Sequence, residues 1–238
     1  MGALAQASMN LVLDQFLQYT EAREEEILAN EDKLDIYEDR LGGYLVQISQ
    51  HGTSADDNHT ISRLLHAIGD FERIGDHILN LQQSAKELHD KQLRFSDAAR
   101  EELAVLTHLM QDILDASLSC FREDDPIAAQ QVEPLEETMD CLTDEIRSRH
   151  IRRLQTGECT IQLCFVLNDL LNNFERVSDH CSNIAVSVIE ERDSHIAAHA
   201  YLHDMKKNGE FAVRLQQNLK RYALPAETAE PAPQSVEE

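Results

Sequence analysis

The sequence has 238 residues, with 44 Asp and Glu against 21 Lys and Arg, so its formal net charge is −23. A charge this acidic argues against nucleic acid and anionic lipid as direct partners, because both bind positive surfaces, whereas it suits cations. Aromatic residues make up 5% of the chain, with 8 Gly and 5 Pro. These are too few turn-forming residues for a β-rich fold, so long helices are expected.

Apolar residues recur every three or four positions along most of the chain, which predicts an all-α protein. His51-Gly52-Thr53-Ser54 combines a helix stop with an N-cap, Ser96 is a second N-cap, and Pro126 opens a further helix. The predicted helices cover about 4–29, 31–50, 56–91, 97–121, 126–156 and 160–192, with a short tail helix within 193–223 and a disordered acidic tail at 224–238.

The five cysteines form no Cys-x-x-Cys pair, which disfavours a disulfide framework and a structural zinc site and indicates a reduced, cytoplasmic compartment. No run of about 18 apolar residues is present, so direct insertion of this chain into a membrane is not expected. The N-terminus has no signal peptide and opens almost directly into an amphipathic pattern, as though it continued a longer chain.

An internal repeat organises the chain. The segment from Phe71 to Asn80 recurs from Phe174 to Asn183, with Phe, Glu, Arg, Asp, His and Asn at matching places and an offset of 103 residues. Acidic residues on the preceding predicted helices also recur, at an offset of 105: Glu31, Asp35 and Asp39, and then Glu136, Asp140 and Asp144. The pattern predicts two tandem three-helix bundles, over residues 1–92 and 93–192.

Each repeat places acidic side chains one helical turn apart. Glu72, Asp76 and Asn80 form one column of oxygen-bearing groups, and the second repeat has the same column at the equivalent positions. Carboxylate oxygens suit hard cations, and facing helices of a bundle can supply four or more to one site. The alternative is a solvated acidic face, with Arg73 and Arg176 screening the glutamates.

Three further groups of residues have two interpretations each. His77 and His180 are either metal ligands or hydrogen-bonded side chains, and we expect the second. The stripe of His195, His199 and His203 is either a second cation site or an exposed polar face. The basic cluster of Arg147, Arg149, Arg152 and Arg153 either contacts phosphate or a partner, or is the charged C-terminal end of a helix, which is the interpretation we prefer.

The segments Phe71–His77 (FERIGDH) and Phe174–His180 (FERVSDH), within paired three-helix units, resemble the PhoU family. Residues 39–45 (DRLGGYL) and 149–159 (RHIRRLQTGEC) are more similar to one branch, the cytosolic PhoU-like domain that follows the membrane part of bacterial sodium/phosphate cotransporters. The resemblance covers the chain up to about residue 192. Ser178 replaces Gly75 in the second copy, and Asn173 replaces Asp70, so the two sites need not be equal.

The resemblance implies two three-helix bundles, a role in regulating phosphate uptake, and metal binding through the Glu-x-x-x-Asp motifs, with iron, zinc or another divalent cation. The implied metal ligands are Glu72, Asp76, Glu175 and Asp179, with Asp35, Asp39, Asp140 and Asp144 as weaker partners.

Three functions are therefore considered. The first is a cytoplasmic regulatory domain of a sodium-dependent phosphate transporter, held at the inner face of the membrane by an upstream transmembrane region. Independently of the function, the amphipathic first helices could pair two chains as a homodimer. The second is a free-standing PhoU regulator that couples a phosphate importer to a sensor kinase. The third, a di-iron carboxylate enzyme, is disfavoured because the chain contains no Glu-x-x-His motif, so no enzymatic activity is expected.

Overall fold

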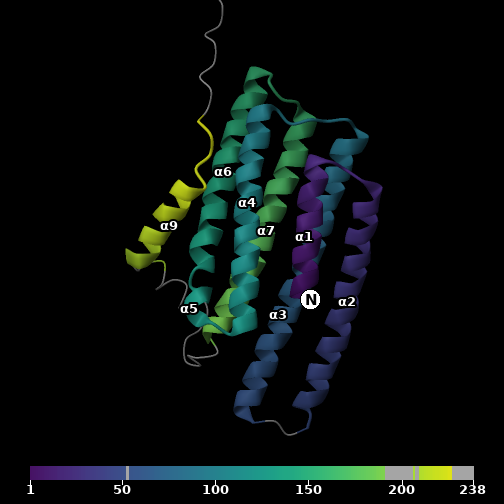
Figure 1. The fold of residues 1–238 in the computed structure, drawn as a ribbon, viewed down its shortest axis with the longest axis vertical. Coiled ribbons are helices and arrows are strands. Elements are labelled where there is room, and N and C mark those ends of the chain that lie inside the picture. Colours follow the sequence, from purple (N-terminus) through teal and green to yellow (C-terminus); the bar gives the residue numbers. More distant parts are fainter. Residues whose placement is uncertain (52–53, 191–205, 207–208, 227–238) are drawn as a thin grey trace, which may run out of the picture.

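The computed structural model describes the whole chain except residues 52–53, 191–205, 207–208 and 227–238 (Figure 1). The predicted histidine stripe and nearly all of the predicted acidic tail lie outside the described residues. The described part is helical: α1 (Gly2–Leu17), α2 (Glu21–Ser49), α3 (Ala55–Asp90), α4 (Asp97–Glu123), α5 (Pro126–Ala129), α6 (Val132–Thr156), α7 (Ile161–Glu190) and α9 (Gly209–Arg221). The all-α prediction is confirmed.

The predicted boundary between the first two helices is wrong. The first helix does not continue to about residue 29, because α1 ends at Leu17 and Gln18 is extended. Thr20 then caps α2, its hydroxyl accepting a hydrogen bond from the backbone N–H of Arg23. The buried Gln15 side chain holds this turn, since its carbonyl accepts from the Thr20 N–H at 2.7 Å and its amide donates to the Thr20 carbonyl at 3.0 Å.

The other predicted caps are confirmed, but the helix predicted over 126–156 is divided in two. Ser54 forms a capping box with Asp57 at the start of α3, and Ser96 accepts from the Ala99 N–H at the start of α4. Pro126 opens a separate one-turn helix, α5, and α6 begins only at Val132. The α6 helix ends at Gly157, whose φ of 80° is the left-handed conformation that glycine adopts without strain.

The helices α1, α2 and α3 form one three-helix unit, and α4, α6 and α7 form the other (Figure 1). Their third helices, α3 and α7, pack against each other between the two units. A single continuous core joins them, because buried residues such as Met9, Ile74, Ile113 and Phe174 belong to one cluster. The α9 helix packs on the outer side of α6.

One end of the first unit is left uncovered. The hairpin of α2 and α3 projects well past the start of α1, which is marked N in Figure 1. Among the described residues, no helix has both the length and the apolar character needed to span a membrane.

Candidate functional site

In the first repeat, carboxylates from α2 and α3 face each other, and the α2 members are not the predicted partners Asp35 and Asp39. Glu72 interacts with Asp76 on its own helix and with Glu38 on α2, and burial followed by these like charges raises the pKa of Glu72 to about 7. Glu31 lies near Asp76, and burial together with neighbouring acids raises its pKa as well.

The predicted α2 partners, Asp35 and Asp39, are both exposed. Asp35 lies close enough to Glu31 to raise the pKa of that carboxyl. The structure thus brings Glu31 and Glu38 towards the α3 motif rather than Asp39. These two residues are seven apart, which is the spacing of the buried Ile27 and Leu34 on the same helix.

In the second repeat, Glu175 and Asp144 already share a cationic partner, Arg147. Glu175 accepts hydrogen bonds from the Thr143 hydroxyl at 2.6 Å and from Arg147 at 3.2 Å. Arg147 also contacts Asp144 at 2.9 Å, so it links a predicted α6 ligand to a predicted α7 ligand. Burial, followed by the charges of Asp179 and Glu175, raises the pKa of Asp140 to about 6.

Two further acidic residues of α6, Glu133 and Glu136, are buried. Glu133 pairs with Lys206 at 3.1 Å, and Glu137 binds the same ammonium at 2.7 Å. Glu136 differs, because its Oε2 atom has no hydrogen-bond partner. Burial raises the pKa of Glu136 to about 8, with Glu133 as the next largest cause.

The repeats differ at the positions that neutralise the motif. At the offset of 105 that relates α2 to α6, Arg147 corresponds to Gly42, and Thr143 corresponds to Glu38. The second repeat therefore carries its own counter-ion for Glu175, whereas Glu72 faces another acid. The two acidic sites therefore differ in this counter-ion as well as in the replacement of Asp70 by Asn173.

The chemistry of these residues fits a hard divalent cation, since the donors are carboxylate oxygens. Their geometry does not gather them around one point: within the described residues, no group of three or more His, Cys, Asp or Glu side chains is arranged so that it could hold a metal ion. Metal binding at the eight predicted ligands therefore stays a prediction.

The residues beside the motif join the two repeats. His77 Nδ1 lies 2.9 Å from Asn173 Oδ1, and His180 Nδ1 lies 2.9 Å from Asp70 Oδ1, so each histidine bonds a residue of the other repeat. The two imidazole rings stack with centroids 5.7 Å apart. The expected hydrogen-bonded role of both histidines is confirmed, and Asp70 and Asn173 are their partners.

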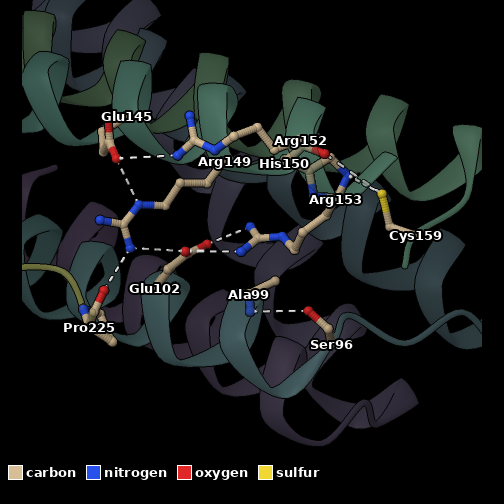
Figure 2. A network of polar contacts seen from close by, with 10 residues as sticks. All are labelled: Ser96, Ala99, Glu102, Glu145, Arg149, His150, Arg152, Arg153, Cys159 and Pro225. Carbon is tan, nitrogen blue, oxygen red and sulfur yellow. Dashed lines mark hydrogen bonds and ion pairs between the residues drawn. The ribbon is translucent and has the colours of Figure 1, made fainter. Parts of the chain in front are cut away.

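The basic cluster is used for packing between helices. Arg153 binds the buried Glu102 of α4 through two hydrogen bonds, of 3.0 and 2.6 Å, and Arg149 binds the same carboxylate at 3.4 Å (Figure 2). Arg149 also pairs with Glu145 at 2.8 Å and donates to the carbonyl of Pro225 at 2.7 Å. Carboxylates neutralise these charges, so the structure favours the interpretation of the cluster as the charged C-terminal end of a helix.

A cavity of about 670 Å³ lies between the C-terminal ends of α1 and α3 and the start of α4. Its walls include Leu17, Tyr19, His89, Phe95 and Arg100. None of the predicted metal ligands lines it, so the cavity and the acidic motifs are separate features.

Two solved structures have the same fold as this chain. PhoU from Pseudomonas aeruginosa aligns with a TM-score of 0.76 at 20% identity, covering 82% of this chain and 92% of that protein. The phosphate transport system regulatory protein PhoU from Streptococcus pneumoniae aligns with a TM-score of 0.73 at 15% identity, covering 82% and 91%.

Sequence comparison gives the family. The model of the PhoU domain matches residues 1–85 and 103–188, which is more than half of the chain, so the chain belongs to the PhoU family. The phosphate-specific transport system accessory protein PhoU homolog of Xylella fastidiosa (strain 9a5c) is 24% identical over 189 residues, 79% of either chain. PhoU homolog 1 of Thermotoga maritima is 22% identical over 187 residues, covering 78% of this chain and 80% of the relative.

Proposed function

We propose that this chain is a regulator of phosphate uptake that acts as a separate polypeptide on a phosphate-transport system. The observation that carries the proposal is the PhoU domain match in both halves of the chain. The relatives are described as accessory proteins of phosphate-specific transport systems. This favours the free-standing regulator over the predicted domain of a sodium-dependent cotransporter, which nothing in the comparisons supports.

A genetic experiment tests this role. The gene is deleted from its host, the 238-residue chain is returned on a plasmid, and uptake of radiolabelled phosphate is measured in phosphate-rich medium. Restoration of regulated uptake by the separate chain is the expected result. Restoration only when the chain is fused behind a membrane transporter would support the cotransporter domain instead, and uptake that is unaffected by the deletion would contradict both.

We further infer that a divalent cation binds the first repeat in preference to the second. Burial, followed by the charges of Asp76 and Glu38, raises the pKa of Glu72, and Arg73 offsets this only in part. Glu175, by contrast, has Arg147 at 3.2 Å. A cation in the first repeat would relieve the repulsion among carboxylates, and in the second repeat it would have to compete with a guanidinium.

The preference is tested with two matched double variants, Glu72→Gln/Asp76→Asn and Glu175→Gln/Asp179→Asn. Bound metal is quantified by elemental analysis, and the rise in Tm on adding Mn²⁺, Fe²⁺ or Zn²⁺ is recorded. The first variant is expected to lose both the metal and the rise in Tm, while the second keeps them. Equal metal content in the parent and both variants would overturn the inference.

A further inference from the structure

The cavity of about 670 Å³ lies where the chain passes from the first three-helix unit to the second. Its walls come from the C-terminal ends of α1 and α3, from the connection between α3 and α4, and from the first turns of α4. In Figure 1 it lies at the upper end of the molecule, opposite the turn between α2 and α3. The volume falls in the range of about 300–1,000 Å³ that is typical of small-molecule sites.

A left-handed turn at the end of α3 forms one side of the cavity. Gln92 has a φ of 52°, and its N–H bonds the carbonyl of His89 at 3.1 Å, while the N–H of Leu93 bonds the carbonyl of Leu88 at 2.9 Å. The side-chain amide of Gln92 also donates to the His89 carbonyl, at 2.7 Å. These bonds close the helix end in the manner usually adopted by glycine, and they place Leu93 and Phe95 in the cavity wall.

The inner wall is apolar and is held by the core. Leu13 is 5% exposed and belongs to the core cluster, and Phe16 and Phe95 pack against that cluster. On another side, the ring of Tyr19 stacks on the imidazole of His89, with centroids 4.3 Å apart and an angle of 17° between the planes. The apolar body of a ligand would therefore meet a surface that is already formed.

The charged groups of the cavity reverse the balance of the whole chain. Its described lining contains Arg94, Arg100 and the imidazole of His89, against a single carboxylate, that of Asp14, whereas acids outnumber bases by 44 to 21 in the sequence. Arg94 has no acidic partner in the part of the chain that the structure describes. Arg100 pairs with Asp97, whose side chain is 87% exposed, and a surface contact of this kind holds an arginine only weakly.

We propose that this cavity binds a small amphipathic anion, with its apolar body against the inner wall and its carboxylate or phosphate group towards Arg94 and Arg100. A guanidinium group recognises the oxygens of carboxylates and phosphates through charge-assisted hydrogen bonds. The inference goes beyond the proposed regulation of phosphate uptake, because it concerns another ligand and a site away from the acidic motifs. The bound anion contacts both three-helix units, since α1 and α3 belong to one and α4 to the other.

The experiment compares ligands that share an eight-carbon chain and differ in the headgroup. Octanoate, octyl phosphate, 1-octanol and octylamine are each titrated into the full chain by isothermal titration calorimetry, and inorganic phosphate is titrated separately. The two anions are expected to bind about tenfold more tightly than the alcohol and the amine, because only they accept hydrogen bonds as charged groups. Whichever anion binds more tightly identifies the headgroup.

Three results of this titration would overturn the proposal. The first is the absence of binding by both anions. The second is binding of 1-octanol or octylamine as tight as that of the anions, since the arginines would then play no part. The third is binding of inorganic phosphate as tight as that of octyl phosphate, since the apolar wall would then play no part.

Two variants of the chain place the binding in the cavity. Arg94→Gln should weaken both anions by about tenfold and leave 1-octanol unchanged, and Arg122→Gln, at an exposed arginine of α4 outside the cavity, is its control. Ala104→Phe adds a ring at the cavity lining and should abolish binding of both anions. Its control is Ala98→Phe, which lies on the exposed surface of the same helix and outside the lining.

Thermal unfolding gives a second measurement of the same binding. A ligand that binds the folded chain raises Tm, so octanoate or octyl phosphate should raise Tm in the parent and in Ala98→Phe but not in Ala104→Phe. Circular dichroism without ligand checks that each variant is folded. Anion binding that both Arg94→Gln and Ala104→Phe leave unchanged would place the ligand elsewhere and overturn the proposal.

Discussion

A buried acidic side chain on α6 is expected to make the stability of the protein depend on pH. Glu136 is 8% exposed, and its pKa is raised to about 8, mainly by burial. A raised native pKa means that the unfolded chain releases this proton at lower pH than the folded chain does. The contribution of Glu136 to stability is therefore fully present below the ordinary pKa of about 4.5 and is lost as the pH rises towards 8.

The free energy of unfolding of the Glu136→Gln variant should depend less on pH than that of the parent, because the amide stays neutral. We expect its free energy of unfolding to match the parent near pH 5 and to exceed it at pH 8 by on the order of 1–3 kcal/mol. Urea denaturation at both pH values measures the difference. Glu26→Gln, at an exposed position of α2, is the control. If parent and Glu136→Gln differed in free energy of unfolding by the same amount at both pH values, the raised pKa of Glu136 would be contradicted.

The acidic motifs could be predicted only in part. Residues four apart on one helix share a face, so Glu72 and Asp76 are visible in the sequence as a pair. Which side of α2 meets them depends on how α2 and α3 cross, and the chain places Glu38 there and leaves Asp39 exposed. The role of Arg147 could not be predicted, because the spacing of acidic residues does not show which basic residue lies beside them.

The turn between α1 and α2 depends on a side chain rather than on glycine or proline. Gln15 bonds both the N–H and the carbonyl of Thr20, and its amide also lies 3.2 Å from Gln82 Oε1 on α3. No Gly or Pro marks this break, which is why the sequence predicts an uninterrupted helix there. By contrast, Ser54 and Ser96 carry local N-cap signals, from which the starts of α3 and α4 are predicted.

Replacing Gln15 with alanine should therefore loosen this turn. The backbone groups of Thr20 lose their partners, and we expect the free energy of unfolding to fall by about 1–3 kcal/mol. Gln18→Ala, at an exposed position in the same turn, should change it by less than about 0.5 kcal/mol. Guanidinium denaturation of both variants measures the contrast, and equal effects would show that the side-chain bonds are unimportant.

The contact between α4 and α6 should be among the most sensitive in the molecule. Removing the carboxylate in Glu102→Ala leaves the guanidinium groups of Arg149 and Arg153 without it in a nearly buried site. Loss of one member of a buried ion pair costs about 3–5 kcal/mol. The neighbouring Glu101 is exposed, so Glu101→Ala is the matched control, and thermal unfolding followed by circular dichroism compares the two. A small effect of Glu102→Ala would mean that water replaces the carboxylate.

Over the whole molecule, the net charge of −23 opposes compaction through self-repulsion. Raising NaCl from about 10 mM to about 300 mM shortens the Debye length from about 30 Å to below 8 Å, so long-range repulsion is screened. We expect Tm to rise over this range and to level off once the screening is complete. A Tm that falls with salt would show that the specific ion pairs outweigh the net repulsion.

The hydrogen bonds between His77 and Asn173 and between His180 and Asp70 have a consequence for the independence of the two halves. Each histidine is completed by the other half of the chain, as happens across the twofold axis of a homodimer. A three-helix unit separated from its partner would therefore leave its histidine without this bond. The same pairing is not symmetric in chemistry, because Asp70 of the first repeat corresponds to Asn173 of the second.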